Sequence, residues 1–231
     1  MGTLYIVSTP IGNLEDITQR ALRVLSEVDL IAAEDTRVTR KLLSHYGIKT
    51  RMQSCHEHNE RVQAPRLLER LQSGENIALV CDAGTPTVSD PGFLLVRLCR
   101  EADAHIEPIP GPSAAIAALS ASGLPTDQFH YAGFPPQKAG KRRRFFAALK
   151  DLTATLIFYE SPYRILRTLE ELEEILGNRS SCLAREITKR YEEFVSGHLS
   201  ELAIRCRSKA PKGELVLLVS GARKGTPAST G

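Results

Sequence analysis

Residues 82–92 read DAGTPTVSDPG and come directly after the apolar run at 77–81. A buried strand therefore leads into a loop that is rich in glycine, proline, serine, threonine and aspartate. Glycine and proline set unusual backbone dihedral angles, and the other side chains supply polar atoms. A loop of this kind at the carboxyl end of a parallel strand is where open α/β sheets bind their ligands.

The same arrangement recurs in the first half of the chain. Three more apolar runs end in polar or Gly/Pro-rich turns, namely 4–7 before STPIGN (8–13), 30–33 before EDTR (34–37) and 106–109 before PGPSAA (110–115). The carboxyl ends of parallel strands meet at one edge of a sheet. The loops therefore predict one cleft that is built from several connections.

The alternation of apolar runs with helical patterns predicts an α/β protein with two α/β domains. Strands are expected at 4–8, 29–33, 76–81 and 105–109, with a weaker one at 49–53. Helices between them predict a mostly parallel N-terminal sheet with helices on both faces. Asp16 and Gln19 predict a capping box at the start of the first helix, and Pro65 predicts that the third helix begins near that residue.

The pattern changes near SASGLPTD (120–127), which predicts a domain boundary. We expect an N-terminal domain at 1–122, a C-terminal domain with a mixed sheet at 123–221, and a disordered tail at 222–231. The second domain is expected to hold one strongly helical segment at 163–176 and five strands, at 129–133, 154–160, 181–186, 191–196 and 214–220.

Composition excludes several classes of protein. No apolar run approaches the ~20 residues of a membrane helix, and the N-terminus lacks the pattern of a signal peptide. The five cysteines are scattered and odd in number, which predicts reduced thiols and a cytoplasmic location. The sequence contains neither GxGxxG nor GxxxxGK[ST], so a standard dinucleotide fold and a P-loop nucleotidase are not supported. The net charge of +3 is too small to identify a nucleic-acid partner by itself.

Two acidic or metal-like patterns leave alternatives open. CHEH (55–58) has two histidines that an extended segment would place on one face, but no second ligand pair follows at zinc spacing. We therefore expect no metal and a polar loop that lines the cleft. Glu34 and Asp35 either cap the following helix or point a carboxylate at a substrate, where Asp35 would accept a proton. Arg37 follows at once and either lies on a solvated helix face or holds phosphate.

Residues 128–150 are strongly basic and contain interleaved phenylalanines. The string GFPPQKAGKRRRFF predicts a mobile loop that enters a helix, because like charges repel and no acidic residue is near in sequence. Such a loop suits RNA, through phosphate contacts and base stacking; the alternative is a solubilising surface run. The predicted RNA contacts are Arg37, Lys138, Lys141, Arg142, Arg143 and Arg144.

Eight segments together resemble one family, the tetrapyrrole-methylase-like S-adenosylmethionine methyltransferases. They are VSTPIGNLEDIT (7–18), LIAAEDTR (30–37), DAGTP…SDPG (82–92), PGPSAA (110–115), GFPP (133–136), FYESPYR (158–164), REITKRYEE (185–193) and KGELVLLV (212–219). The resemblance runs from residue 4 to about residue 220. It is closest to a bacterial branch that 2′-O-methylates a cytidine in the decoding centre of 16S ribosomal RNA.

The resemblance implies a homodimer with S-adenosylmethionine bound in a cleft between the two domains. It implies that Asp35 stands where an acid serves as proton acceptor in relatives that methylate tetrapyrroles. It implies 16S RNA in the small ribosomal subunit, or its precursor, as substrate. Carried over by position, the cofactor contacts would be Pro10, Asp82, Ala83, Gly84, Thr85, Val88, Ser113, Ala114, Tyr159, Glu160 and Gly213.

Two alternative functions remain open at this point. The same fold could methylate a tetrapyrrole intermediate, since carboxylate-rich tetrapyrroles also attract cations. A non-catalytic RNA-binding module that has lost its cofactor is the other alternative. The intact Gly/Pro loops argue against that module, and calorimetry with the cofactor would separate the two classes.

Overall fold

The computed structural model describes residues 1–222, so the predicted tail lies, apart from residue 222, outside the described residues. The chain divides into two compact units between Ser113 and Ala114. The boundary predicted after residue 122 therefore lies too far along the chain. The reason is helix α5 (Ala114–Ala121), which contacts strands β7 and β10 of the second unit.

The first unit contains a five-stranded parallel sheet with the order β3-β2-β4-β1-β5. Its strands are β1 (Thr3–Val7), β2 (Leu30–Ala33), β3 (Met52–Ser54), β4 (Ile77–Val80) and β5 (His105–Ile109). Strand β4 lies in the middle of the sheet, and the weakest expected strand, β3, lies at its edge. The predicted parallel sheet is confirmed.

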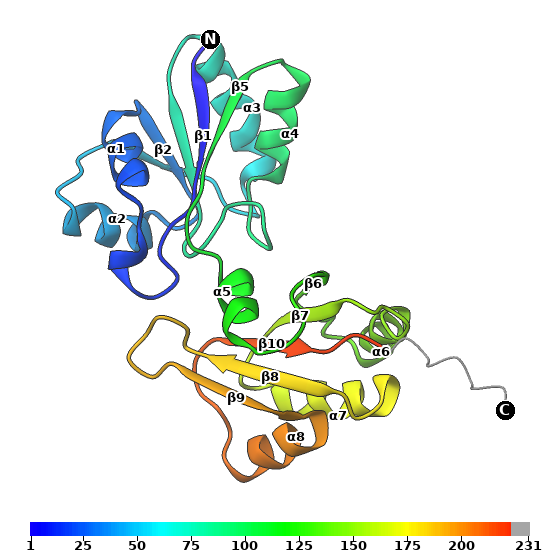
Figure 1. The fold of residues 1–231 in the computed structure, drawn as a ribbon. Helices are drawn as coiled ribbons and strands as arrows, with labels where there is room; N and C mark the ends of the chain where they lie inside the picture. Colours follow the sequence, from blue (N-terminus) through cyan, green and yellow to red (C-terminus); the bar gives the residue numbers. More distant parts are fainter. Residues whose placement is uncertain (223–231) are drawn as a thin grey trace, which may run out of the picture. The chain divides into compact units, whose positions relative to one another are not determined.

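Helices cover both faces of this sheet, as predicted (Figure 1). They are α1 (Gln19–Glu27), α2 (Thr36–His45), α3 (Glu60–Gln72) and α4 (Phe93–Glu101). Alternate residues of a strand face opposite sides of a sheet. Accordingly Ile31 and Ala33 pack with α1 and α2 in one core, whereas Leu30 and Ala32 pack with α3 and α4 in the other.

Two helix starts differ from the predictions. Helix α1 is capped by the Thr18 hydroxyl, which accepts from the Ala21 N–H at 3.1 Å, and Asp16 lies in the preceding 3-10 turn at Leu14–Asp16. Helix α3 begins at Glu60 and contains Pro65. Pro65 is exposed, so the Arg61 carbonyl that loses its intrahelical donor can bind water.

The second unit contains a mixed five-stranded sheet with the order β6-β7-β10-β8-β9. Its strands are β6 (Phe129–Gly133), β7 (Thr155–Glu160), β8 (Ser180–Arg185), β9 (Glu193–His198) and β10 (Leu215–Val219). Strand β6 is parallel to β7, and the other neighbours are antiparallel. The mixed sheet predicted for this half is also confirmed.

Three helices share one face of the second sheet and form a single core with it. They are α6 (Ala139–Ala148), α7 (Ile165–Leu176) and α8 (Leu199–Ser208). Phe158 contacts Phe146 of α6, while the next residue, Tyr159, accepts a hydrogen bond from the Ala115 N–H of α5 at 3.2 Å. Helix α5 therefore lies on the opposite face (Figure 1).

The basic segment at 139–148 is an ordered helix, so the predicted mobile loop is wrong for this part. Helix α8 was not expected from the sequence. It begins with a capping box in which the Glu201 carboxylate accepts from the His198 N–H at 2.7 Å. Within residues 1–222, no helix is long and apolar enough to cross a membrane.

Candidate active site

The loops that end β1 and β4 are tied together at the carboxyl edge of the first sheet. Thr9 and Gly84 form an antiparallel bridge, in which the Thr9 N–H donates to the Gly84 carbonyl at 2.8 Å and the Gly84 N–H to the Thr9 carbonyl at 3.0 Å. The Thr9 hydroxyl donates to the Cys81 carbonyl at 3.1 Å. Gly84 has a φ of +87°, a conformation that favours glycine.

A third loop joins the other two through hydroxyl groups. The Ser8 and Thr85 hydroxyls share a hydrogen bond of 2.9 Å, and the Thr85 hydroxyl donates to the Pro112 carbonyl at 3.3 Å. A Cβ atom on Gly111 would lie 2.8 Å from the Ser8 Cβ. The predicted convergence of the loops after β1, β4 and β5 is thus present in the first unit.

The central loop continues with strained backbone. Thr87 and Ser89 have φ values of +74° and +67°, which residues other than glycine rarely adopt. Val88 between them is 41% exposed. Asp82 and Ala83 are also exposed, whereas Pro10 on the neighbouring loop is half-buried. Strain of this kind recurs at ligand sites, where the surrounding structure holds it in place.

Carboxylates gather beside these loops. The Asp82 N–H donates to the Glu34 carboxylate at 3.2 Å, and the Asp35 N–H donates to the Asp82 carboxylate at 3.1 Å. Burial raises the pKa of Glu34 and of Asp82. The charges of Asp82 and Asp35 raise the pKa of Glu34 further, and the charge of Asp35 does the same for Asp82. Burial, with Glu34 next in effect, raises the pKa of Asp90 to about 6. The edge is therefore negatively charged and short of cationic partners.

Asp35 differs from these neighbours because it has a cation of its own. Its carboxylate accepts from the Arg37 N–H at 2.8 Å and so caps α2, and it forms an ion pair with the Arg37 guanidinium at 2.6 Å. These hydrogen bonds hold the pKa of Asp35 well below its ordinary value. The Arg37 side chain is 86% exposed. The capping interpretation is confirmed, and the catalytic role of Asp35 stays a prediction.

In the second unit, the motif loops meet at one edge of the mixed sheet. Strand registers place Glu160 opposite Leu215, Leu215 opposite Arg185, and Arg185 opposite Glu193. The connections after β6, β7 and β8 and before β10 therefore leave the sheet at the same end. These connections hold GFPP, YESPYR, REITKRYEE and KGEL.

The predicted cofactor residues of this unit lie at that edge but differ in access. Tyr159 is half-buried and Gly213 is exposed, with a φ of +87°. The Glu160 side chain is fully buried, pairs with Arg164 at 2.6 Å and accepts from the Thr168 hydroxyl at 2.7 Å. The Glu160 carboxylate is therefore taken up by the fold. Ser113 and Ala114 stand on either side of the division between the units.

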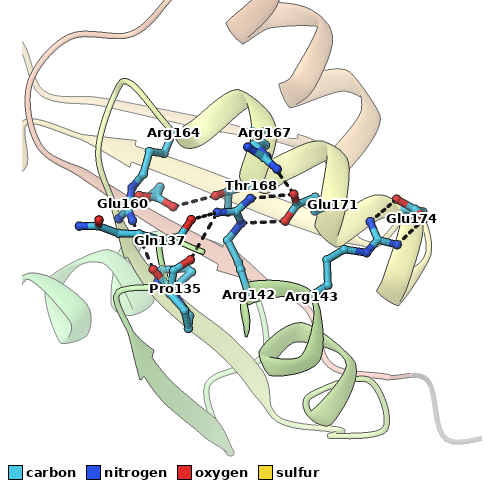
Figure 2. Close-up of polar contacts among 11 residues, drawn as sticks. Pro135, Gln137, Arg142, Arg143, Glu160, Arg164, Arg167, Thr168, Glu171 and Glu174 are labelled. Carbon is cyan, nitrogen blue, oxygen red and sulfur yellow. Dashed lines mark hydrogen bonds and ion pairs between the residues drawn. The ribbon is translucent and has the colours of Figure 1, made fainter. Parts of the chain in front are cut away.

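The basic segment separates into buried and exposed cations, and Figure 2 shows the carboxylates that pair with Arg142 and Arg143. The Arg142 side chain is 4% exposed and makes a bidentate ion pair with Glu171, with both hydrogen bonds at 2.7 Å. Arg143 makes an exposed pair with Glu174. No acidic residue lies within this segment, and both paired carboxylates come from α7. Within the described part of the chain, Lys138, Lys141 and Arg144 are exposed and have no ion-pair partner.

Comparison with known proteins identifies the group to which the chain is related. Residues 3–203 match the family described as Tetrapyrrole (Corrin/Porphyrin) Methylases. The chain belongs to the tetrapyrrole methylase family. The resemblance seen in the sequence motifs is thereby confirmed.

Two curated members of the family are close to this chain in sequence. "Ribosomal RNA small subunit methyltransferase I" of Escherichia coli O157:H7 is 54% identical over 223 residues, which are 95% of this chain and 78% of that protein. The protein of the same name from Halalkalibacterium halodurans is 51% identical over 220 residues, which are 95% of this chain and 76% of that protein.

Solved structures share the fold of this chain. Uroporphyrin-III-C-methyltransferase from Thermus thermophilus superposes with a TM-score of 0.67 at 22% identity, over 94% of each chain. The methyltransferase CobJ superposes with a TM-score of 0.72 at 20% identity, over 96% of this chain and 95% of that chain. At these identities the likeness supports the fold alone.

The other pattern weighed in the sequence, CHEH, does not assemble a metal site. Cys55 is buried, and burial raises the pKa of its thiol to about 11. The His56 and His58 rings lie edge to face with centroids 6.0 Å apart. Among residues 1–222, no three His, Cys, Asp or Glu side chains are placed to hold a metal ion.

Sequence reasoning missed three members of these two edges. Ser8 lay inside a quoted motif but was not assigned, although a hydroxyl next to a Gly/Pro turn is a signal for loop bonding. Asp90 lay in the central loop, and its burial depends on packing that no local pattern reveals. Phe134 was noted only as part of the basic segment, yet it is 55% exposed beside Tyr159.

Proposed function

We propose that this member of the family transfers a methyl group from S-adenosylmethionine to the ribose 2′-oxygen of a cytidine in the decoding centre of 16S ribosomal RNA. The observation that carries the proposal is the 54% identity over 95% of the chain to a protein named for methylation of small-subunit ribosomal RNA. The exposed cations Lys138, Lys141 and Arg144 agree with a polyanionic substrate.

The carboxyl edge of the first sheet fits the cofactor in chemistry. S-adenosylmethionine carries a sulfonium and an ammonium group, and the edge offers the carboxylates of Glu34, Asp82 and Asp90 without basic partners of their own within residues 1–222. Gly111 leaves the backbone bare where a Cβ atom would crowd Ser8, and Gly84 adopts a φ of +87° that other residues rarely take. The proposed contacts from this unit are Pro10, Asp82, Ala83, Gly84, Thr85, Val88 and Ser113.

The second unit contributes Ala114, Tyr159 and Gly213 to this proposal. Tyr159 already accepts a hydrogen bond from the Ala115 N–H, which fixes its ring beside α5. Glu160 acts through its position: its buried carboxylate holds Arg164 and Thr168, and so orders the turn that follows β7. Gly213 lies against Glu186, whose carboxylate also accepts from the Glu214 N–H at 2.9 Å.

The cofactor supplies a methyl group that is already activated for displacement. The protein has to align the ribose hydroxyl and accept its proton as the transition state develops. Asp35 is the proposed acceptor, although its ion pair with Arg37 makes it a poor base in the resting state. A phosphate group of the RNA that binds Arg37 would draw the guanidinium away from Asp35 and raise its basicity when substrate is present.

The test is methyl transfer by the purified protein. Tritiated S-adenosylmethionine is incubated with small ribosomal subunits, with protein-free 16S RNA and with uroporphyrinogen III, and the modified nucleotide is mapped by mass spectrometry. We expect label on the 2′-oxygen of one cytidine and none on the tetrapyrrole. Label on the tetrapyrrole alone would replace the proposal, and cofactor binding without transfer to any acceptor would indicate a binding module.

Two further expectations belong to this proposal. We propose that the protein works as a homodimer and in the cytoplasm, where its buried thiols at Cys81, Cys99 and Cys182 stay reduced. Sedimentation velocity over a hundred-fold range of concentration measures the first. Fractionation of the source cells measures the second.

A further inference from the structure

Two aromatic side chains stand out from the edge where the motif loops of the second unit meet. Phe134 follows β6 and is 55% exposed, and Tyr163 follows β7 and is 96% exposed. Strands β6 and β7 are parallel neighbours, so their following loops leave the sheet side by side. The Arg164 guanidinium donates to the Pro135 carbonyl at 3.3 Å and joins the two loops directly.

The loop at 135–137, which follows Phe134, is held in place by the buried Arg142 and the half-buried Arg164 (Figure 2). Arg142 donates to the Gln137 carbonyl at 2.8 Å and to the Pro136 carbonyl at 3.3 Å. Its other nitrogens are fixed by Glu171, as described above. Because each carbonyl along 135–137 receives a guanidinium hydrogen bond, the loop presents Phe134 on a preorganised backbone. The loop is already ordered before RNA binds, so binding does not have to include the entropy cost of ordering it.

One side of the Phe134 ring is supported, and the rest is open to solvent. Phe134 packs edge to face on Tyr159 with centroids 5.5 Å apart, and Tyr159 packs in the same way on Tyr131 at 5.2 Å. Lys138, at the start of α6, is exposed on the same loop. An exposed ring and a cation without an ion-pair partner on one loop can bind unpaired nucleotides, through stacking on the base and contact with the phosphate.

We propose that Phe134, Tyr163 and Lys138 form a stacking platform for unpaired nucleotides of the RNA substrate. The inference rests on the proposed function and adds the residues that contact the RNA. Arg142 and Arg164 are positioning residues in it, since they hold the loops and leave contact with RNA to their neighbours.

A second basic surface of the unit fits RNA less well. A groove of about 540 Å³ is lined by residues 208–212 together with Arg185 and Arg205. Glu193 pairs with both guanidiniums, at 3.4 and 2.6 Å, so phosphate contacts in this groove would fall to Lys209 and Lys212. No aromatic side chain is among the described residues that line this groove. Base stacking therefore favours the platform.

The experiment compares Phe134→Ala with Phe129→Ala. Phe129 is the matched control, because it is 45% exposed and lies at the opposite end of the same strand. Affinity for protein-free 16S RNA is measured by filter binding from 50 to 300 mM salt, together with transfer of label to small ribosomal subunits. Phe134→Ala is expected to weaken binding by about ten-fold or more with an unchanged salt slope, since stacking releases no counterions.

The remaining variants separate stacking from charge. Tyr163→Ala is expected to behave like Phe134→Ala. Lys138→Ala is expected to lower the log–log salt slope by about 0.7, the value for one phosphate contact on a single strand. Phe129→Ala is expected to bind and methylate as the wild-type protein does.

Several results would overturn the platform. Equal RNA affinity of the Phe134→Ala and Phe129→Ala variants would contradict the platform. If the wild-type protein still transferred methyl groups to RNA, the proposed function would be unaffected by that result. Loss of transfer through a raised dissociation constant for S-adenosylmethionine would assign Phe134 to the cofactor site instead. A changed sedimentation coefficient would assign it to a contact between copies. If the wild-type protein modified no RNA at all, the proposed function itself would fail.

Discussion

Carboxylates at the carboxyl edge of the first sheet lie next to one another, whereas those of the second unit lie next to arginines. Glu34 and Asp82 share hydrogen bonds with backbone N–H groups, and burial raises the pKa of both. In the second unit, Arg142 and Arg143 lower the pKa of Glu171 and of Glu174. Carboxylates whose surroundings destabilise the ionised form are concentrated at functional sites. Carboxylates in ion pairs with arginine more often have a structural role.

Charged side chains therefore have different roles in the two units. In the first unit, Glu34, Asp82 and Asp90 make no ion pair within residues 1–222, and we propose that this edge suits a cationic ligand. In the second, paired charges fix the helices α6 and α7 and the loop at 135–137. Substitutions at the first edge should therefore change binding or turnover, and substitutions in the second network should change stability.

The largest expected effect tests the one ion-paired carboxylate of the first edge. Asp35→Asn keeps the size of the side chain and its cap on α2 but removes the basic carboxylate. We expect turnover to fall about 100-fold or more, with S-adenosylmethionine affinity unchanged, because a proton acceptor contributes on this scale. Single-turnover transfer and calorimetry measure the two quantities. Wild-type turnover would leave Asp35 as a helix cap only.

Arg37→Ala sharpens the same test, since it removes the group that lowers the pKa of Asp35. The pKa of Asp35 should then move back up toward its ordinary range. The acid limb of the pH–rate profile should therefore move to higher pH in this variant. The log–log slope of RNA affinity against salt should decrease by ~0.7–0.9, the value for one phosphate contact. An acid limb that stays in place would separate Arg37 from the chemistry.

Crowding the first edge should abolish binding without unfolding the unit. Thr85→Trp places a large ring where the loops after β1, β4 and β5 meet through the Ser8 and Pro112 hydrogen bonds. We expect no measurable heat of binding with S-adenosylmethionine. Thr85→Val is the matched control, because it keeps the volume and loses only the hydroxyl. A Trp variant that binds normally would move the cofactor away from this edge.

The second network should show the opposite behaviour. Arg142→Leu leaves the Glu171 carboxylate, 11% exposed, with only the exposed Arg167 as partner at 3.0 Å. Removing one member of a buried pair typically costs several kcal/mol, and we expect about 3 kcal/mol of unfolding free energy here. Urea unfolding measures it. Arg143→Leu breaks only an exposed pair and is expected to unfold close to the wild-type midpoint.

The sequence predicted the positions of the loops better than the partners of the charged side chains, because a loop and the strand before it are adjacent in sequence. Gly84 and its neighbours follow an apolar strand directly, so both the strand end and the turn are visible in one short window. The partner of Arg142 lies 29 residues away on α7, and only the packing of α6 on α7 brings them together. A basic run therefore looked mobile in sequence although one of its arginines is buried.

Two other failures have the same origin. Pro65 reads as a helix start, yet Ala64 before it is buried in the same core as Leu67, and α3 begins at Glu60. Helix α8 has only weak periodicity of its own and is stabilised by its packing on α7. Family motifs, in contrast, fixed the order of the loops and strands across both units. Tertiary contacts decided what local propensity left open.

The smallest expected effect is a difference in how stability depends on pH. The pKa of Asp90 is raised to about 6 from an ordinary value of 3.8, so between these values the native protein holds a proton that the unfolded chain has released. Stability should fall as pH rises through this window. Asp90→Asn removes the penalty and should be more stable than the wild type at pH 7.5, by about 1 kcal/mol, since the half-exposed carboxyl is screened by water. The stabilities of Asp90→Asn and the wild type should coincide near pH 3.5.

Glu171→Gln should show a pH dependence of the opposite sign. Arginine pairing lowers the pKa of Glu171, so the stabilisation that this pairing gives is lost as pH falls. Melting temperatures between pH 3.5 and 7.5 measure both. Parallel curves for the two variants would mean that the carboxylates of the two units are in similar environments, and the contrast between the units would not hold.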